Sequence, residues 1–492
     1  MTSFDWRLDG RTKGLPAGSP PLSRSDIARA GWNVLREDLP LALAVLKESS
    51  LRHNAAWMNA FRALTQVEIA PHGKTSMSPE LYARQLNDGA WGITVATVQQ
   101  LRVCRDAGIR RVLLANQLVG RQSIRYVREE LARDPRFEFC CLVDSVAGAD
   151  LLAKMGSGSN SKMGSGSNFP PGVATTKSEP DPNSGSKSEP DPNFGRPIDV
   201  LLECGAMGAR TGCRTVDDAL AVARRVAQAK PHLRLIGVEG FEGAIHGATP
   251  AETDAKIEAF VRFIGEVAAR CADEGLIDAD PILLSAGGSA YFDIATKLPR
   301  RFGGRVARVM LRSGCYLTHD SDSYAKAAER MRTRMPEIAQ LGEGLRDALE
   351  VWSYVQSLPE PGLAILTMGK RDVSYDQHLP FPRWRFRPDD REPAAPAVAT
   401  AGSRSAGDAP GRTSARAATS TPNKPTPLGD GYTITALNDQ HAFMRVPATH
   451  DLRVGDMIGC TIAHPCTTFD KWRFLPIVDD EYTVIDAITT WF

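Results

Sequence analysis

A lysine at the end of an apolar run is the residue of this sequence with the clearest potential for covalent chemistry. The run TQVEIA leads directly into Pro71-His72-Gly73-Lys74-Thr75, so the Lys74 amine follows a predicted strand and a glycine that lets the backbone approach a ligand. A lysine held away from bulk water loses its proton more readily and can form an imine with an aldehyde cofactor. From this spacing alone, a solvated surface lysine is the commoner interpretation.

Two later strand ends carry glycine-containing turns of a kind that binds phosphate. One turn holds Gly287, Gly288 and Ser289 after PILLS, and the other holds Gly314 and Cys315 after ARVML. Backbone N–H groups from two neighbouring loops could hold one dianion between them. Each turn alone is a weak signal, but two late strand ends and a strand-end lysine together form a constellation of candidate site residues.

A third candidate is the tripeptide His464-Pro465-Cys466 near the C-terminus. Two residues that are two positions apart in an extended chain point to the same side, and imidazole plus thiolate suits zinc. The proline favours an edge strand or a strand end. A His-x-Cys taken alone usually has no metal role.

The elements that would position these residues are short apolar runs alternating with amphipathic helices over residues 36–335. Such alternation predicts a parallel sheet covered on both sides. Without the first low-complexity stretch this region has ~260 residues, close to the ~250 of a (β/α) barrel, in which chemistry lies at the C-terminal strand ends. An open, doubly wound sheet is the alternative. The nine runs are LALAVLK, TQVEIAPHGKT, WGITVAT, RRVLLANQLV, FEFCCLVD, IDVLLECG, LRLIGVEGF, PILLSAGGS and ARVMLRSG.

The remaining chain divides into a second domain, an N-terminal segment and two insertions. Residues 336–492 are rich in strands without intervening helices, which predicts an antiparallel β domain. Residues 1–35 have too little pattern to be placed alone and are a candidate for joining it. Two low-complexity stretches, about 154–196 and about 391–428, contain too little apolar surface to build a core and are predicted to be disordered insertions.

Composition favours small-molecule chemistry in a reducing compartment. The formal net charge is +1 and no basic block is present, so neither nucleic acid nor a membrane surface is indicated as a partner. No run approaches the length of a membrane helix, and the N-terminus lacks a signal-peptide pattern, which predicts a cytoplasmic protein. The nine cysteines form no CxxC pair and fit reduced core thiols.

At these residues the chain resembles the D-serine dehydratase and D-threonine aldolase family of pyridoxal-phosphate enzymes, whose barrel is of the alanine racemase type. PHGKT is similar to the family's Pro-His-x-Lys-Thr motif, which implies that Lys74 carries the cofactor and that His72 lies beside it. GARTG resembles the segment that places an arginine, here Arg210, near the pyridine nitrogen; a structural salt bridge is the alternative role. GGS and RSGC resemble the phosphate loops, and MGKRDVSYD, LNDQHAF and HPC resemble later motifs, the last implying metal ligands His464 and Cys466.

The resemblance implies a homodimer that acts on a small D-amino acid with pyridoxal 5'-phosphate and zinc. Relatives of the dehydratase type carry a His-x-Cys, so the expected reaction is zinc-assisted dehydration of a D-3-hydroxy amino acid such as D-serine, giving a 2-oxo acid and ammonia. A D-threonine aldolase, cleaving Cα–Cβ to glycine and an aldehyde, is the nearer alternative. An amino-acid racemase and a non-catalytic pyridoxal-phosphate carrier are further ones, although the β domain counts against a carrier.

The chain also departs from the family pattern around the cofactor. Ala70 stands where relatives usually have an arginine, and Ser76-Met77 follow the threonine where His-Lys is usual. In place of an aromatic residue with a nearby Tyr or His, the chain has GVEGFEGAIH, so Phe241 is a candidate cofactor contact and His246 a candidate catalytic base. These changes indicate a divergent subfamily.

Overall fold

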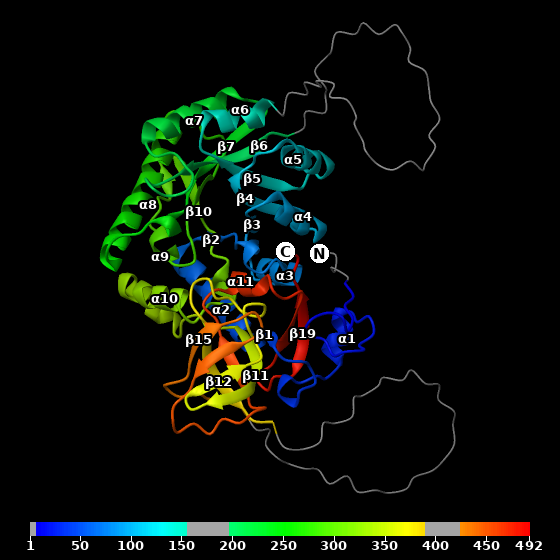
Figure 1. The fold of residues 1–492 in the computed structure, drawn as a ribbon. Coiled ribbons are helices and arrows are strands. Elements are labelled where there is room, and N and C mark those ends of the chain that lie inside the picture. The colour runs from blue at the N-terminus through cyan, green and yellow to red at the C-terminus, as the bar shows by residue number, and fades with distance from the viewer. Residues whose placement is uncertain (1–5, 155–195, 389–423) are drawn as a thin grey trace, which may run out of the picture.

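The computed structural model describes residues 6–154, 196–388 and 424–492, which form a barrel and a β domain (Figure 1). Most of the two predicted insertions lies outside the described residues. Residues 424–428 are an exception, because Thr426 and Pro427 form strand β14 and pair with Arg385 and Trp384. Of the helices described, none is long and apolar enough to cross a membrane.

The barrel has eight parallel strands, in the neighbour order β2-β10-β8-β7-β6-β5-β4-β3. The ring closes between β2 and β3, where the amide of Trp91 donates to Ile69 O at 2.8 Å and that of Thr94 to Pro71 O at 2.9 Å. The predicted (β/α) barrel is therefore confirmed, and the open sheet is excluded. The strands are β2 (Glu68–Ile69), β3 (Ile93–Val95), β4 (Arg111–Gln117), β5 (Glu138–Val143), β6 (Ile198–Cys204), β7 (Leu233–Gly240), β8 (Ile282–Ser285) and β10 (Arg305–Leu311).

Helices surround the outside of this barrel (Figure 1). Several begin at a Ser or Thr whose side chain accepts from the backbone N–H three residues later, as Thr249 does from Glu252 before Pro250 opens α8. The longer barrel helices are α2 (Glu48–Thr65), α3 (Pro79–Asn87), α4 (Val98–Asp106), α5 (Arg121–Arg133), α6 (Val146–Lys154), α7 (Val216–Gln228), α8 (Pro250–Asp273) and α10 (Ser323–Arg334). Shorter elements here are η2 (Gly73–Thr75), η3 (Glu242–Ala244), α9 (Phe292–Ala295), β9 (Arg301–Phe302), η4 (Cys315–Leu317) and η5 (Pro336–Leu341).

Side chains from the strands fill the interior of the barrel as a separate small cluster. Its members include Leu113, Cys140, Leu201, Leu283 and Met310, all buried. Inward-pointing branched and apolar residues are what close a barrel of this size. The barrel floor is therefore packed, and ligands have room only at its two ends.

The β domain contains a ten-stranded sheet in which the antiparallel pairing expected from the sequence predominates. One pair, β1 with β18, is parallel. The strands are β1 (Leu43–Lys47), β11 (Leu349–Glu360), β12 (Leu363–Leu366), β13 (Phe381–Phe386), β14 (Thr426–Pro427), β15 (Thr433–Leu437), β16 (Ala442–Arg445), β17 (Met457–Thr461), β18 (Phe474–Val478) and β19 (Val484–Thr489). A short helix, α11 (Pro465–Phe469), follows β17.

The N-terminal part of the chain belongs to the β domain more extensively than the expected boundary at residue 36 implies. LALAVLK, which we expected to be a barrel strand, contains β1, and β1 lies between β11 and β18 in the other sheet. The preceding segment also lies there, with α1 (Arg24–Arg29) against β19 and η1 (Val34–Arg36) beside the bridge of Asn33 to Thr483. The chain enters the barrel only after Lys47.

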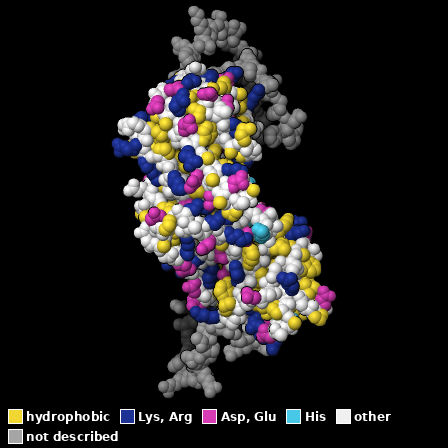
Figure 2. All heavy atoms as spheres, turned by 90° about the vertical axis from the view of Figure 1, so that its left-hand side faces the viewer, with side chains coloured by type: hydrophobic (Ala, Val, Ile, Leu, Met, Phe, Trp, Pro, Cys, Tyr) yellow, Lys and Arg dark blue, Asp and Glu magenta, His cyan; other side chains and the backbone are white. Residues whose placement is uncertain are grey.

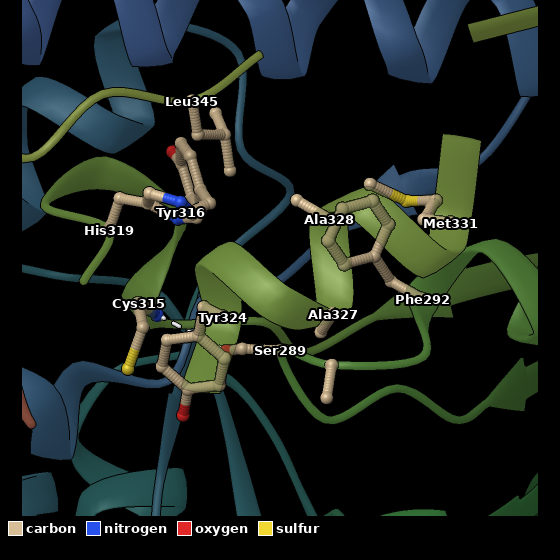
Figure 3. A pocket seen from close by; sticks show the side chains of 11 residues that line it. Ser289, Phe292, Cys315, Tyr316, His319, Tyr324, Ala327, Ala328, Met331 and Leu345 are labelled. Carbon is tan, nitrogen blue, oxygen red and sulfur yellow. Dashed lines mark hydrogen bonds between the residues drawn. The ribbon is translucent and has the colours of Figure 1, made fainter. Parts of the chain in front are cut away.

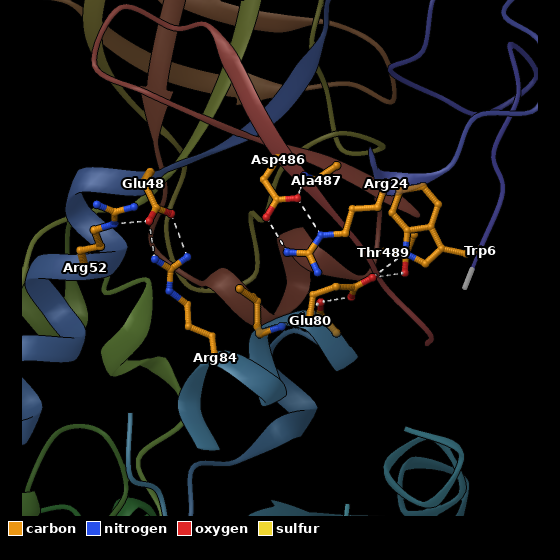
Figure 4. Close-up of polar contacts among 11 residues, drawn as sticks. Trp6, Arg24, Glu48, Arg52, Glu80, Arg84, Asp486, Ala487 and Thr489 are labelled. Atoms are coloured by element: carbon orange, nitrogen blue, oxygen red, sulfur yellow. Dashed lines mark hydrogen bonds and ion pairs between the residues drawn. The ribbon is translucent and has the colours of Figure 1, made fainter. Parts of the chain in front are cut away.

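Polar contacts fix the β domain against α3 of the barrel (Figure 4). Glu80 on α3 accepts from Trp6 Nε1 at 2.5 Å and from Thr489 Oγ1 at 3.1 Å. Beside it, Arg84 forms a bidentate pair with Glu48 at 2.8 and 2.6 Å. The two bonds of Glu80 connect the β domain to α3 of the barrel, whereas the pair of Arg84 and Glu48 joins α3 to α2 within the barrel.

On the face in Figure 2, basic and acidic side chains lie among one another and among apolar ones. This mixed distribution agrees with the near-zero net charge of the chain.

Candidate active site

A cavity of about 820 Å³ lies at the C-terminal ends of the barrel strands, where the β domain covers them. A volume of this size accommodates a cofactor together with a small substrate. Every site residue expected from the sequence lines it, namely His72, Lys74, Arg210, Phe241, His246, Gly287, Gly288, Ser289, Gly314, Cys315, His464 and Cys466. The structure thus brings together residues from five strand ends and from the second domain.

Lys74 lies in η2, directly after β2, and its side chain is accessible from the cavity. Among the described residues it has no hydrogen bond or ion pair, so its amine is available for a ligand. A hydrogen bond from α3 holds the turn that carries Lys74, because Tyr82 Oη donates to Gly73 O at 2.8 Å. A β-carbon on Gly73 would come within 2.9 Å of that ring, which explains why glycine precedes the lysine.

His72 is a neutral ring at the edge of the cavity. Desolvation lowers the pKa of this imidazole well below its usual value, and the charges of Lys74, Arg312 and Arg210 lower it further. Its Nδ1 is buried without a hydrogen-bond partner. A buried, unpartnered ring nitrogen beside an accessible lysine is available to a ligand in the cavity.

The two glycine turns lie side by side but differ in the amides they leave free. Gly287 and Gly288 donate their N–H groups to the buried Glu242 carboxylate, at 3.0 and 2.5 Å. Glu242 thereby shapes the loop, and those two amides are not free for a phosphate. The remaining polar groups are the Ser289 hydroxyl, 3.4 Å from the Cys315 amide nitrogen, and the backbone around Gly314.

Gly314 is required by the close approach of this turn to the lysine turn. A β-carbon here would lie 2.5 Å from His72 O and 2.7 Å from Thr75 Oγ1. We expect Gly314→Ala to push the two turns apart and weaken cofactor binding by ~10–100-fold, because overpacking typically costs ~1–3 kcal/mol. Gly304→Ala, with nothing within 4 Å of the new methyl group, is the matched control. Titration of both apoproteins with pyridoxal phosphate measures the effect, and equal affinities would contradict it.

The floor of the cavity holds a buried ion pair that sequence reasoning missed. Arg312 pairs with Glu239 and also donates to Gly240 O at 2.8 Å. Both side chains are at most 5% exposed. Glu239 ends a predicted strand and Arg312 follows one, the same placement as the other site residues. That placement was the available signal, but a single charged residue at a strand end does not show that its partner follows the second strand along, on the other side of β8.

Burial raises the pKa of Glu239 from 4.5 to about 7, and the nearby Arg312 opposes that rise. Between these two values the folded protein binds more protons than the unfolded chain, so its stability falls as pH rises. We expect the free energy of unfolding of wild type to decrease from pH 5 to pH 7 relative to Glu239→Gln, with a slope difference of up to about 1.4 kcal/mol per pH unit. Denaturant titrations at several pH values test this, and parallel stability curves would contradict it.

Arg210, Phe241 and His246 form the outer wall of the cavity. The Arg210 guanidinium lies 4.4 Å from the centre of the Phe241 ring, a cation–π contact. Arg210 and His246 are both exposed. Arg210 is therefore an exposed side chain on the loop after β6. Arg312, by contrast, is buried in the cavity lining and held by Glu239.

The tripeptide of His464, Pro465 and Cys466 does not adopt the extended geometry expected of it. His464 is the extended N-cap of α11, and Pro465 takes its first turn, so Cys466 is already helical. Even so, both side chains line the cavity. His464 Nδ1 lies 2.6 Å from Asp376 Oδ2, an arrangement that fixes the ring and leaves Nε2 as the ligand atom. Asp376 directly follows MGKRDVSY within the same predicted motif, so the sequence did contain a signal for that region.

A second cysteine meets Cys466 inside the cavity. Cys315 Sγ lies 3.8 Å from Cys466 Sγ, and Thr75 Oγ1 lies 3.7 Å from each sulfur. A hydrogen bond with Cys466 lowers the pKa of Cys315, aided by the Tyr324 hydroxyl, and the same bond raises the pKa of Cys466. Figure 3 shows Cys315 and Tyr324 with sulfur and hydroxyl pointing the same way, and Ser289 bonded to the Cys315 amide.

The side chains of His464, Cys466 and Cys315 are not arranged around one common point. Within the described ranges, no three His, Cys, Asp or Glu side chains are grouped closely enough to constitute a ready metal site. The cavity nevertheless presents an imidazole held by a carboxylate and two adjacent sulfurs within one volume.

Comparisons with known proteins point to one group of enzymes. Residues 348–478 match the family model of the putative serine dehydratase domain. The D-threonine aldolase of an Arthrobacter species is 23% identical over 458 residues, 92% of each chain. The 3-hydroxy-D-aspartate aldolase of Paracoccus denitrificans is 28% identical over 187 residues, 37% of this chain and 43% of that protein.

Solved structures show that the fold is shared along nearly the whole chain. The D-threonine aldolase of Filomicrobium marinum has a TM-score of 0.64 at 19% identity, covering 94% of this chain and 97% of its own. D-threo-3-hydroxyaspartate dehydratase from Delftia sp. HT23 has a TM-score of 0.61 at 18% identity, covering 93% and 98%. An alanine racemase-like protein from Idiomarina loihiensis has 0.58 at 13% identity, covering 95% and 98%.

Proposed function

Since the chain belongs to the D-serine dehydratase and D-threonine aldolase family, we propose that it is a pyridoxal-phosphate-dependent, metal-assisted lyase that removes water from D-3-hydroxy amino acids. The observation that carries the proposal is the convergence, on one cavity, of the free amine of Lys74, the turns of Ser289 and Gly314, and the pair His464 and Cys466. No single one of these features would suffice.

The residues fit pyridoxal phosphate. Lys74 has no competing partner among the described residues and would hold the aldehyde carbon. The Ser289 hydroxyl and the backbone of Gly314 and Cys315 would hold the phosphate, at a turn that any side chain on Gly314 would fill. Arg210 and Arg312 both line the cavity, and a guanidinium beside the cofactor's ring nitrogen would keep that nitrogen unprotonated, because a guanidinium cannot accept a proton.

The residues also fit a zinc ion. Asp376 orients His464 as an outer-shell carboxylate orients a metal-binding imidazole, and a neutral imidazole with a thiolate forms a soft donor set. One of the solved D-threo-3-hydroxyaspartate dehydratase structures is a metal-free form of a cysteine-to-alanine variant.

When bound, pyridoxal phosphate would withdraw electrons from the substrate Cα and a zinc ion would stabilise charge on the leaving hydroxyl. Lys74 would move the proton at Cα, since its amine lines the cavity without a competing partner among the described residues. His72 is uncharged, which makes it a weak acid there. The β domain would shield these groups from part of the solvent, because its residues His464 and Cys466 line the same cavity.

The cavity mouth favours anionic substrates. Lys326 and Arg330 line it, and the Nε of Arg330 is buried without a partner. Lys326 is paired with Asp322 at 2.5 Å, so Arg330 is the better candidate for a substrate carboxylate. His378 lies on the other side of Asp322, at 2.9 Å.

A D-threonine aldolase is the second candidate, because two curated relatives are named as aldolases. Cleavage of Cα–Cβ needs a base on the β-hydroxyl, and His246 at the exposed rim is the available imidazole. Both reactions use the same cofactor and differ in the bond that breaks.

Incubation of the purified protein with D-serine, D-threonine and D-3-hydroxyaspartate separates the candidates. We expect a 2-oxo acid and ammonia in equal amounts, with little glycine. Stoichiometric glycine and aldehyde would establish the aldolase instead. Interconversion of enantiomers without either product set would indicate a racemase, and no turnover of a cofactor-loaded protein would indicate a carrier.

A further inference from the structure

Glu242 is a buried carboxylate that the proposed reaction does not use. It lies in η3, directly after β7, and it is fully buried, whereas its neighbours Phe241 and Gly243 line the cavity. Burial of a carboxylate costs free energy unless hydrogen bonds compensate for the lost water. The partners of Glu242 therefore show which part of the site its carboxylate holds in place.

Both oxygens of this carboxylate accept from the backbone of the turn after β8. Glu242 Oε2 accepts from the Gly287 amide at 3.0 Å, and Oε1 accepts from the Gly288 amide at 2.5 Å. An ionised carboxylate only accepts hydrogen bonds, so one such group can satisfy two adjacent N–H donors. Because buried N–H groups almost always have a partner, the conformation of this turn depends on a side chain from the neighbouring strand end.

The turn that Glu242 holds carries Ser289 toward the turn after β10. The Cys315 amide donates to the Ser289 hydroxyl at 3.4 Å, and Ser313 Oγ donates to Gly288 O at 3.3 Å. These are the two turns that would hold the phosphate, and together they are the phosphate cradle. Gly288 is bonded through both its N–H and its carbonyl, so a change at Glu242 would be transmitted to the cradle.

We propose that Glu242 is a positioning residue for the cofactor phosphate, because by holding Gly287 and Gly288 it places the Ser289 hydroxyl in the phosphate cradle. This inference rests on the proposed function, since it assumes that the cavity binds pyridoxal phosphate. Glu242 acts through the turn and not by touching the phosphate. Lys74 lies on a different turn, after β2, so attachment of an aldehyde there does not depend on Glu242.

Paired titrations of the apoproteins with pyridoxal phosphate and with pyridoxal, which lacks the phosphate, measure this role. We expect Glu242→Gln to weaken binding of pyridoxal phosphate by ~10-fold, because a side-chain amide accepts from one N–H group and opposes the other with its own NH2 group. Glu242→Ala, which leaves both amides without that acceptor, should weaken it by ~100-fold. The affinity for pyridoxal, followed by imine absorbance, should stay close to that of wild type.

Glu350→Gln is the matched control for these titrations. Glu350 is a buried glutamate of β11 in the β domain, where it accepts from Trp352 Nε1 at 2.9 Å and from Tyr482 Oη at 3.0 Å. Its replacement also removes a buried carboxylate, but the phosphate cradle does not include it. Both affinities of Glu350→Gln should therefore equal those of wild type.

The possible outcomes separate this inference from the proposed function. Equal losses of affinity for both aldehydes in Glu242→Gln, or no loss for either, would overturn the positioning role and leave the proposed function intact. A wild-type protein that forms no imine with pyridoxal phosphate would overturn the proposed function and this inference with it. Glu242→Gln preserves the size of the side chain, so it decides the question if Glu242→Ala does not fold.

Discussion

Replacement of Lys74 with alanine is expected to abolish turnover and the visible absorbance of covalently bound cofactor together. Lys74 is the cavity amine without a partner among the described residues, and it lies beside the phosphate cradle. General acid–base catalysis alone contributes ~10²–10⁴-fold, and loss of covalent attachment adds to this, so activity should fall by at least ~10⁴-fold. Absorbance spectra of the purified protein and an assay of 2-oxo acid formation measure both effects.

Lys326→Ala is the matched control for that experiment, because Lys326 lines the same cavity but is paired with Asp322. It should retain the cofactor absorbance. A Lys74→Ala protein that still carries covalent cofactor, or still turns over, would show that another amine is the attachment point.

Removal of the metal is expected to separate catalysis from cofactor binding. Chelation, or His464→Ala, should lower deamination of D-serine by ~10²–10³-fold, because Lewis-acid stabilisation is worth several kcal/mol and each ~1.4 kcal/mol is tenfold. The cofactor spectrum should be unchanged, since Lys74 and the phosphate cradle do not include His464. Bound metal, 2-oxo acid and glycine are measured for each sample.

Cys466→Asp tests the same metal site by replacing a soft thiolate ligand with a hard carboxylate ligand. A carboxylate favours manganese or magnesium, so zinc dependence should weaken and elimination should fall. Any gain of glycine from D-threonine should be small, because aldol cleavage also needs a base on the hydroxyl. His378→Ala, at another histidine of the cavity, should retain the metal and serves as the control. Full deaminase activity of metal-free His464→Ala would rule out metal assistance.

The barrel could be predicted from sequence because each strand and helix carries its own local pattern. LALAVLK shows the limit of such patterns. It is an apolar run before an amphipathic helix, as a barrel strand would be, yet β1 pairs with β11 and β18, which lie far later in the chain. The apolar pattern of LALAVLK therefore cannot show which strands, so far away in the sequence, it pairs with.

The site residues could be predicted for a similar reason, since strand ends of a barrel converge whatever the loops contain. The relation between Cys315 and Cys466 could not, because it depends on how the two domains dock. The local conformation of Cys466 was predicted wrongly, because a proline such as Pro465 opens a helix as readily as it ends a strand. The role of Asp376 depends in the same way on the tertiary contact that brings it to His464.

The position of β1 bears on how the protein is made. During synthesis β1 is made before the barrel, whereas its neighbours β11 and β18 are made after it. The barrel can therefore fold on the ribosome before β1 has a strand to pair with. The segment of 348–478 that matches the family model lacks both β1 and β19. Expressed alone, it would expose the edges of β11 and β18, and such edges promote aggregation. The segment that sequence comparison recognises as a domain is therefore an incomplete sheet without the N-terminal segment that ends in β1.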